Sequence, residues 1–574
     1  MMLSEGKESV IAFGDAVRQA LVYGWIDRWK VTRDRNLLKL IAQGSRSHIA
    51  RLPSELLAEI FHWCILHDHA EHVRSPMDPA PRSWLTVRCV CRAWNQVVLA
   101  YPVFSTHIPL TRPRRVSDML DRSGILPLYI YCAPSSYLDK EDKAEMLALV
   151  LDHFPRVAHL SLQFPFYNEL VDSRWWQAPH ADQAASCLQS FYLRDFYLRA
   201  FSMPNSNGPP VLNQGVQLFS GYAFPALRDL KCRGIHTPLS VLGNVLVPGL
   251  RCLHLTDIRS TPLEEELLPL LKRLPELEEL RFNLALSLSE HSRDTIQYLL
   301  ATSEPSRRVE LPRLAMLYIA DNKEDASLAG FLLLHRLSIP PSASIELFLL
   351  RTGGISDALW DACTDVVLEK MRPVRYHALS ISTNFAGRNV DVELWEEPLR
   401  IEDLPPVPEL FDSSPCQTRS SGRAGHFRLE LSSPCRAFTA RLIPQLPTSY
   451  VRTARLTDRT VGFQHGIPWD ATLSALPSVE DLVLQYETFK HIQSRANPRP
   501  YQITPADTRS LHIPALRTLR LYELHHQYSQ ISEFALDIVT LGCIAHGLAK
   551  QAREHRSEDV LVIRGAQPYR RGDV

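Results

Sequence analysis

Residues 274–282 of the chain, LPELEELRF, place a proline and three apolar side chains at a fixed spacing. The order is proline, any residue, apolar, two residues, apolar, any residue, apolar. The same order occurs in FPALRDLKC (224–232), VPGLRCLHL (247–255) and IPALRTLRL (513–521). Its last part alternates apolar residues with others, which is the period-two signal of a short β-strand with one buried face. The chain is therefore expected to contain a series of similar strands.

The spacing of this phrase indicates a repeat. Pro225, Pro248 and Pro275 are 23 and 27 residues apart. Looser copies begin at Pro155, Pro312 and Pro477. The phrase and its period resemble the leucine-rich repeat, in which each unit is a short strand followed by a helix or a loop. The resemblance implies that stacked neighbours bury the spaced leucines in one continuous core. We expect an irregular leucine-rich-repeat solenoid over residues 151–574, with the loosest matches between 320 and 470.

The segments between the phrases also carry patterns. Glu264–Leu274 has the apolar spacing of an amphipathic helix, and Ile531–His555 is predicted to be another, followed by a last strand at 560–563. Cys232 and Cys252 lie inside two of the phrases, so both are expected in the apolar core. Three stretches rich in Pro, Ser, Asn and Gly are predicted to be loops: 202–216, 403–426 and 493–508.

A different pattern occupies residues 52–61, LPSELLAEIF. Pro53 suits the first turn of a helix, where its missing N–H costs nothing, and Glu55 and Glu59 complement the positive end of the helix dipole. The apolar residues follow the helical repeat in a stripe wide enough to require burial. A second helix is predicted over Ser83–Leu99. Two helices of this length bury too little to be stable alone, so they must pack on a neighbour or a partner.

Three short motifs in this region resemble the F-box. They are LPSELLAEIF at 52–61, VCRAW at 90–94 and YPVF at 101–104, and residues 118–128 resemble the segment just after the F-box in a large fungal group of proteins. In that family a small helical module docks on the Skp-family adaptor of a cullin–RING ubiquitin ligase, and the rest of the chain recruits a substrate. This chain departs from the family in two ways. Phe104 stands where tryptophan is common, and the connection between the helices, about 66–82, is long.

The resemblance implies a set of adaptor-binding residues. One group should form the adaptor-facing surface: Leu52, Pro53, Leu56, Leu57, Ile60 and Phe61. A second group should complete that surface or hold the helices together: Leu85, Val87, Val90 and Trp94. Burial of one aliphatic or aromatic side chain contributes roughly 1.5–3 kcal/mol, so a few anchors of this kind are enough to carry a protein interface.

The expected domain order has four parts: an N-terminal helical segment (1–48), an F-box-like domain (49–108), a linker or first repeat-like unit (109–150) and a leucine-rich-repeat-like domain (151–574). Apolar side chains at a spacing of four predict one helix in the first part. The expected fold class is α+β or α/β, with a helical F-box module followed by the irregular solenoid.

Composition and charge bear on partners and location. The chain has 63 basic and 63 acidic residues, so no overall positive field favours nucleic acid. No secretory signal and no apolar run near the roughly 20 residues that span a bilayer are found, so no membrane partner is expected. The cysteines, 11 in number, form no CxxC pair, which fits a reducing cytoplasm or nucleus.

No phosphate loop, GxGxxG, GxSxG or HExxH motif occurs, so neither catalysis nor a cofactor is expected. Cys64 and the histidines between 62 and 72 lack a second ligand pair at zinc-finger spacing, so no metal is expected either. The expected function is the substrate-recognition subunit of a Skp–cullin–F-box ubiquitin ligase. An F-box scaffold without a ligase role is the alternative, and an unrecognised enzyme is the third hypothesis. The repeat face should present residues to a protein substrate: Arg228, Asp229, Arg251, Glu278 and Arg517.

Overall fold

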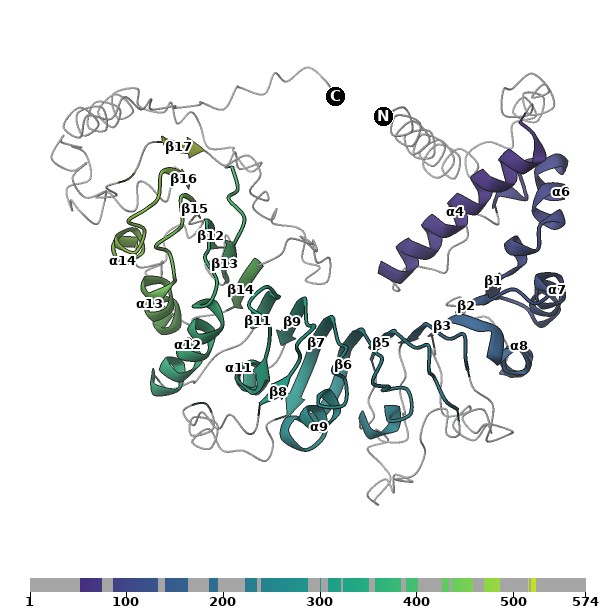
Figure 1. The fold of residues 1–574 in the computed structure, drawn as a ribbon, viewed down its shortest axis with the longest axis horizontal. Coiled ribbons are helices and arrows are strands. Elements are labelled where there is room, and N and C mark those ends of the chain that lie inside the picture. Colours follow the sequence, from purple (N-terminus) through teal and green to yellow (C-terminus); the bar gives the residue numbers. More distant parts are fainter. Residues whose placement is uncertain are drawn as a thin grey trace, which may run out of the picture. The chain divides into compact units, whose positions relative to one another are not determined.

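The fold is known from a computed structural model of the chain (Figure 1). It describes residues 52–74, 86–132, 140–163, 185–194, 222–234, 239–287, 300, 308–321, 324–349, 357–383, 389–400, 426–432, 436–457, 469–485, 515 and 518–522. The chain divides into two compact units: residues 1–236 with 241–247, and residues 237–240 with 248–574. Both units have a mixed α/β architecture in which parallel strand pairs dominate. Among the described residues, no helix is both long enough and apolar enough to cross a membrane.

The first unit begins with helices and continues as alternating strands and helices. Its helices are α4 (Ser54–Arg74), α6 (Arg92–Ala100), α7 (Pro113–Ser123) and α8 (Lys140–Asp152), with short 3-10 turns η3 (Pro102–Ser105) and η4 (Phe154–Arg156). Its strands are β1 (His107–Leu110), β2 (Leu128–Cys132), β3 (Val157–Gln163), β4 (Ser190–Arg194) and β5 (Asp229–Arg233). They pair in chain order, and every pair is parallel. Parallel neighbours need a crossover connection, which α7 and α8 supply for the first three strands.

One row of apolar side chains crosses the whole sheet of the first unit. Ile108, Ile130, Leu160, Phe191 and Leu230 are in register on successive strands, and each is at most 3 % exposed. Helices α7 and α8 bury apolar residues of their own beside this sheet. Successive side chains of a strand point to opposite faces, so His107, Tyr131 and His159 lie on the other face of this sheet, where they are buried too.

The second unit continues the alternation with more strands. Its strands are β6 (Cys252–Pro262), β7 (Glu279–Ser287), β8 (Val309–Glu310), β9 (Met316–Asp321), β10 (Leu337–Ser338), β11 (Ser344–Leu349), β12 (Ala378–Thr383), β13 (Asn389–Trp395), β14 (His426–Ser432), β15 (Thr453–Thr457), β16 (Asp481–Gln485) and β17 (Thr518–Tyr522). Its helices are α9 (Leu268–Leu271), α11 (Glu324–Arg336), α12 (Asp357–Met371), α13 (Arg436–Gln445) and α14 (Trp469–Ser474), with a π-turn η8 (Leu263–Leu267). The 3-10 turn η7 (Leu239–Leu242) lies at the division between the units.

The strand order of the second unit departs from chain order at one place. From β6 the order is β6-β7-β9-β11-β14-β13-β12-β15-β16-β17, while β8 and β10 form a separate parallel pair. Strand β13 is antiparallel to both of its neighbours, and the other pairs are parallel. The segment β12–β14 is thus a meander that folds back, placing β14 and β13 between β11 and β12. A simple one-strand-per-repeat spacing cannot persist through such a meander, which explains the loose sequence matches there.

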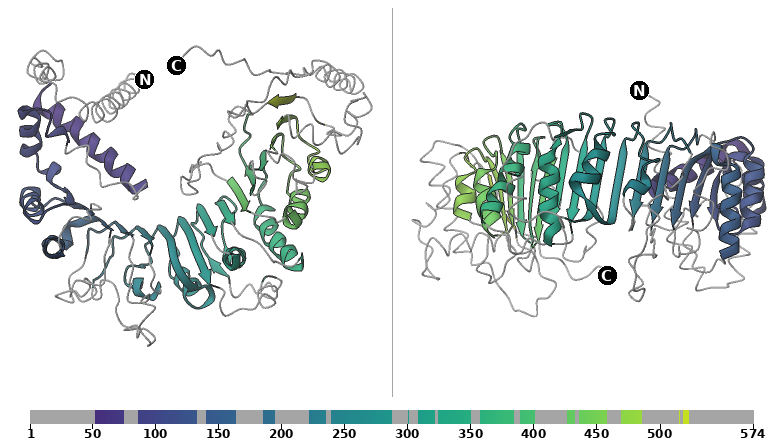
Figure 2. Two further views of the ribbon diagram at one scale, coloured as in Figure 1. Left: turned by 180° about the vertical axis from the view of Figure 1, so that it is seen from behind. Right: turned by 90° about the horizontal axis from the view of Figure 1, so that it is seen from below.

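The core of the second unit is again a row of apolar side chains. Leu280, Leu317, Ile345, Phe427 and Leu394 are in register and at most 5 % exposed. Helices α11–α14 lie on one side of this sheet (Figures 1 and 2). A Cβ added at Gly330 of α11 would meet Ile319 Cγ2 at 3.2 Å, so the helix backbone packs closely on this apolar face. Among the described residues, no helix of the unit covers the opposite, polar face.

Several sequence predictions are confirmed. Strand β7 begins within the phrase at 274–282, and strands β11 and β12 lie in the region between 320 and 470 where the matches are loosest. The expected mixture of helices and strands is also confirmed, and parallel pairs dominate the sheet. The division between the compact units falls inside the expected 151–574 domain, so β3–β5 belong to the same unit as α4 and α6.

Other predictions are corrected. The helix expected over Glu264–Leu274 is a π-turn followed by the short α9, because Pro269 lacks the N–H that a continuous helix would need. The helix expected over Ser83–Leu99 is interrupted: Thr86 and Val87 are helical, residues 88–90 form a turn, and α6 begins at Arg92. The β-branched Val90 lies in that turn, and its lower helix propensity favours the interruption. Helix α4 continues to Arg74, so residues 66–74 belong to the helix and not to the connection.

Cys232 and Cys252 are both buried, as expected, but the expected orientation of Cys252 is corrected. Cys232 is 1 % exposed and in register with core residue Leu193, as expected for an apolar position. Cys252 instead alternates with the core residues Leu253 and Leu255, and its Sγ lies 3.2 Å from His254 Nε2. The phrase itself contained this signal, because its apolar positions in that copy are 250, 253 and 255.

The remaining sequence predictions lie outside the described residues. They are the N-terminal helix within 1–48, Leu85, Arg517, the helix at 531–555, the strand at 560–563, and nearly all of the three predicted loops.

Candidate functional site

The helices α4 and α6 and the turn η3 pack around one aromatic centre. The Phe61 ring of α4 lies 4.8 Å from the Trp94 ring of α6 and 6.3 Å from the Phe104 ring of η3. Leu57 and Ile65 of α4 are buried on the same side as Phe61, one helical turn away in each direction. Phe104, 1 % exposed, therefore keeps a packing role at the position where the sequence departs from the F-box pattern.

The opposite side of α4 is exposed and carries large apolar side chains together with the charged Glu59. Leu56 is 52 % exposed, Trp63 60 % and Leu66 38 %. The Trp63 indole Nε1 donates to Glu59 Oε1 at 3.1 Å, so the polar atom of this ring is satisfied within the helix. Positions 56, 63 and 66 lie within about one third of the helix circumference, so these side chains share one side of α4, with Glu59 between Leu56 and Trp63. We call Leu56, Trp63 and Leu66 the exposed α4 stripe.

The structure divides the expected adaptor-binding residues among three environments. Leu57, Phe61 and Val87 are buried. Pro53 and Leu56 are exposed, and those of intermediate exposure are Leu52, Ile60, Val90 and Trp94. Sequence reasoning did not single out Trp63 and Leu66. The helical spacing of seven and ten residues from Leu56 was the signal that would have found them.

The second half of α4 is fixed on the sheet of the first unit. His69 Nδ1 lies 2.7 Å from the Tyr131 hydroxyl of β2, and His107 Nδ1 of β1 lies 3.0 Å from the same oxygen. The His107 ring stacks on Tyr129 at 4.4 Å. Burial lowers the pKa of His69 to about 4, and burial with the neighbouring His69 and His62 lowers the pKa of His107 to about 3. Both rings are therefore neutral at physiological pH. The hydrogen bond of His69 attaches the helix that carries the exposed α4 stripe to the sheet of the first unit.

A second candidate surface is the polar face of the sheet in the second unit. Arg428 of β14 lies at its centre: Nη2 is 2.9 Å from Asp391 Oδ2, Nε is 3.1 Å from Glu393 Oε1, and Nη2 is 3.6 Å from Glu430 Oε2. The guanidinium also lies 5.0 Å from the centre of the Phe348 ring. Burial and the neighbouring Asp391 carboxylate raise the pKa of Glu393 to about 8, against the opposing charge of Arg428.

The meander is what brings these groups together. Asp391 and Glu393 come from β13 and Arg428 from β14, and the antiparallel register sets Glu393 opposite Arg428. The residues expected on the substrate face lie elsewhere. Arg251 and Glu278, for example, form their own half-exposed ion pair at 3.4 Å just before their strands begin. The charged cluster was missed because its strands lie in the region where the repeat phrase is loosest.

No protein-family model matches the chain, and no curated protein matches it significantly. The function is therefore inferred from the surfaces themselves and from the motifs at 52–104.

Proposed function

We propose that the chain is the substrate-recognition subunit of a Skp–cullin–F-box ubiquitin ligase. The observation that carries this proposal is the exposed α4 stripe. Leu56, Trp63 and Leu66 lie on a helix whose other side already packs on α6 and η3. Contiguous exposed apolar side chains on a soluble domain mark protein interaction sites, and tryptophan is enriched among residues that dominate binding energy.

The chemistry of the stripe fits an apolar groove on the partner. The Trp63 indole N–H already donates to Glu59 within α4, so docking would leave no unpaired donor on this ring. The motifs LPSELLAEIF, VCRAW and YPVF supply the identity of that partner, because they resemble the module that binds the Skp-family adaptor. In this proposal Leu57, Phe61 and Trp94 hold the module together, and Pro53, Leu56, Trp63 and Leu66 contact the adaptor.

The second unit supplies the substrate-binding part of the proposal, as an irregular leucine-rich-repeat-like domain. Its strands present polar side chains on a face that no described helix covers, while the apolar row and helices α11–α14 fill the other face. A face of this kind offers many closely spaced charged groups held on rigid strands, which favours recognition of a polar protein surface. The Arg428 guanidinium, paired with Asp391 and in contact with Glu393, lies on this face.

The test is affinity capture of the tagged full-length chain, followed by detection of a Skp-family adaptor and a cullin. Wild type should capture both, and Trp63→Ala with Leu66→Ala should capture neither. Tyr450→Ala is the matched control, because it removes another exposed aromatic residue, 46 % exposed, from the second unit. Unchanged adaptor capture by the double variant would refute the docking surface.

Deletion of the gene, with measurement of protein levels, separates a receptor from a scaffold. A receptor predicts at least one captured protein whose level rises on deletion and whose ubiquitination is lost. Adaptor capture without any such protein would favour the scaffold function instead.

A further inference from the structure

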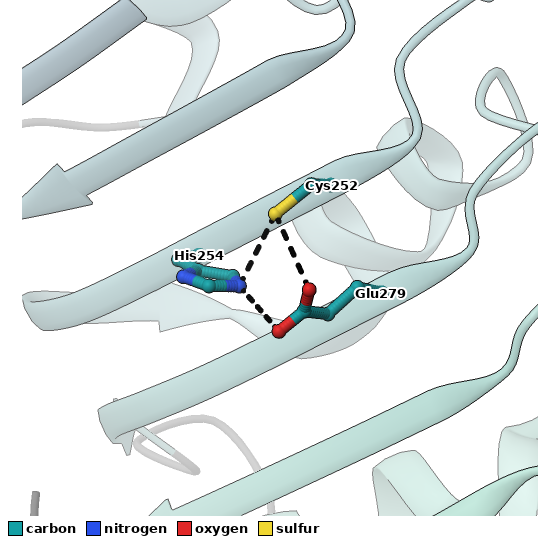
Figure 3. A group of neighbouring side chains, drawn as sticks. All are labelled: Cys252, His254 and Glu279. Atoms are coloured by element: carbon teal, nitrogen blue, oxygen red, sulfur yellow. Dashed lines mark hydrogen bonds and ion pairs between the residues drawn. The ribbon is translucent and has the colours of Figure 1, made fainter. Parts of the chain in front are cut away.

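Three side chains of different chemistry meet on the polar face at the start of β6 and β7 (Figure 3). Cys252 and His254 are two residues apart on β6, so they lie on the same face of the strand. Glu279 of β7 is the register partner of Cys252. Among the described residues, these are the one group of three Cys, His, Asp or Glu side chains with donor atoms all within 4.8 Å of one another.

The donor atoms of the three side chains lie close enough together to bind one metal ion. His254 Nε2 is 3.2 Å from Cys252 Sγ and 2.9 Å from Glu279 Oε1, and Cys252 Sγ is 3.8 Å from Glu279 Oε2. Tetrahedral Zn²⁺ with ordinary bond lengths to sulfur, nitrogen and oxygen sets its donors about 3.3–3.6 Å apart. Small rotations of the three side chains would bring all the donors to that spacing around one ion.

The type of donor selects the metal. A thiolate with an imidazole favours zinc and other late transition metals, whereas Mg²⁺ and Ca²⁺ prefer oxygen ligands. Cys252 is 8 % exposed, and the His254 and Glu279 side chains are 16 % and 32 % exposed. An ion can therefore enter from the polar face. Three protein ligands leave a fourth position for water, as in open zinc sites.

The Glu279 carboxylate also contacts a neighbouring arginine, Arg281. Arg281 Nε lies 2.5 Å from Glu279 Oε1, while Oε2 is the oxygen that faces Cys252. Arg281 thus orients the carboxylate, as outer groups do around metal ligands.

We propose that Cys252, His254 and Glu279 form a zinc-binding site with one open coordination position. Nothing in the proposed adaptor docking requires this site, since α4 belongs to the first unit. The two proposals therefore fail independently.

The experiment uses the purified full-length chain, stripped with a chelator and dialysed against zinc. Bound zinc is measured by elemental analysis, and affinity by competition with a chromophoric chelator. Cys252→Ser and Glu279→Gln should each remove one zinc per chain or weaken its binding by at least about 10- to 100-fold, the loss typical of even outer-sphere partners. Cys187→Ser and Glu278→Gln are matched controls that should bind as wild type does.

Cobalt substitution gives a readout specific for sulfur. Wild type and Cys187→Ser should show the thiolate-to-cobalt charge-transfer band, and Cys252→Ser should lack it. Thermal unfolding of each variant checks that it is folded. The proposal is overturned if wild type retains no zinc, or if Cys252→Ser binds zinc and cobalt as wild type does; the three residues would then be an ion-pair and hydrogen-bond network only.

Discussion

Leu56 and Leu57 are consecutive residues of α4 with opposite surroundings. Leu56 is 52 % exposed, whereas Leu57 is 6 % exposed and lies beside the Phe61 aromatic centre. The same substitution, leucine to aspartate, should therefore have two different effects. At Leu56 it should abolish adaptor binding and leave the fold intact. At Leu57 it should unfold the pair of helices α4 and α6, so that binding is lost because the fold is lost.

The magnitudes follow from burial. Leu57→Asp loses about 1.5–3 kcal/mol of apolar burial and forces a carboxylate into an apolar centre at a further cost of several kcal/mol. That sum is comparable with the roughly 5–15 kcal/mol of a whole domain's stability. Leu56→Asp changes a surface position, where effects on stability usually stay within about 0.5 kcal/mol. Docking would cover its exposed half, so lost burial and carboxylate desolvation together cost about 2–4 kcal/mol, or roughly 30- to 1,000-fold in Kd.

Two measurements on the full-length chain distinguish these effects. Calorimetry or circular dichroism gives the unfolding temperature, and titration calorimetry with a purified Skp-family adaptor gives Kd. The expected result is a wild-type unfolding profile with lost binding for Leu56→Asp, and a lowered or missing first transition for Leu57→Asp. Wild-type affinity in a folded Leu56→Asp variant would refute the assignment of the stripe to the adaptor.

Three further predictions concern stability. First, His69 and His107 have folded-state pKa values of about 4 and about 3, below the ordinary 6.5, so the unfolded chain binds protons first. The first unit should lose stability as the pH falls below about 6.5, and an unfolding temperature constant down to about pH 4 would contradict this. Second, the folded-state pKa of Glu393 is raised from 4.5 to about 8, so the wild type should lose stability as the pH rises through this range. Glu393→Gln should therefore be more stable above pH 8, by roughly 1–3 kcal/mol in urea unfolding, and no difference there would exclude the shift. Third, Leu280 is fully buried, so Leu280→Ala should cost about 2–5 kcal/mol, and Leu280→Asp should unfold the second unit while adaptor binding survives. Normal thermal stability of Leu280→Asp would show that this leucine does not face the core.

The sequence by itself predicted the parts that depend on local periodicity. The phrase at 274–282 predicted strand β7 and its inward residues Leu280 and Phe282, both fully buried. This worked because alternation along a strand is fixed by the pleat and needs no knowledge of distant residues. The same alternation also indicates that Cys252, which lies between the inward residues Leu250 and Leu253, is on the polar face. The segment at 52–61 likewise predicted a helix, whose period identifies apolar faces but not which of them finds a neighbour.

Only the tertiary structure decided which residues meet. It assigned Leu57 to a buried face and Leu56 to an exposed one, because α6 and η3 cover a single side of α4. It placed β13 and β14 between β11 and β12, which set Glu393 opposite Arg428 although no local pattern relates them. The register of β6 on β7 did the same for Cys252 and Glu279. Strand order and register depend on the burial of whole apolar faces, and that energy is shared by residues far apart in the chain.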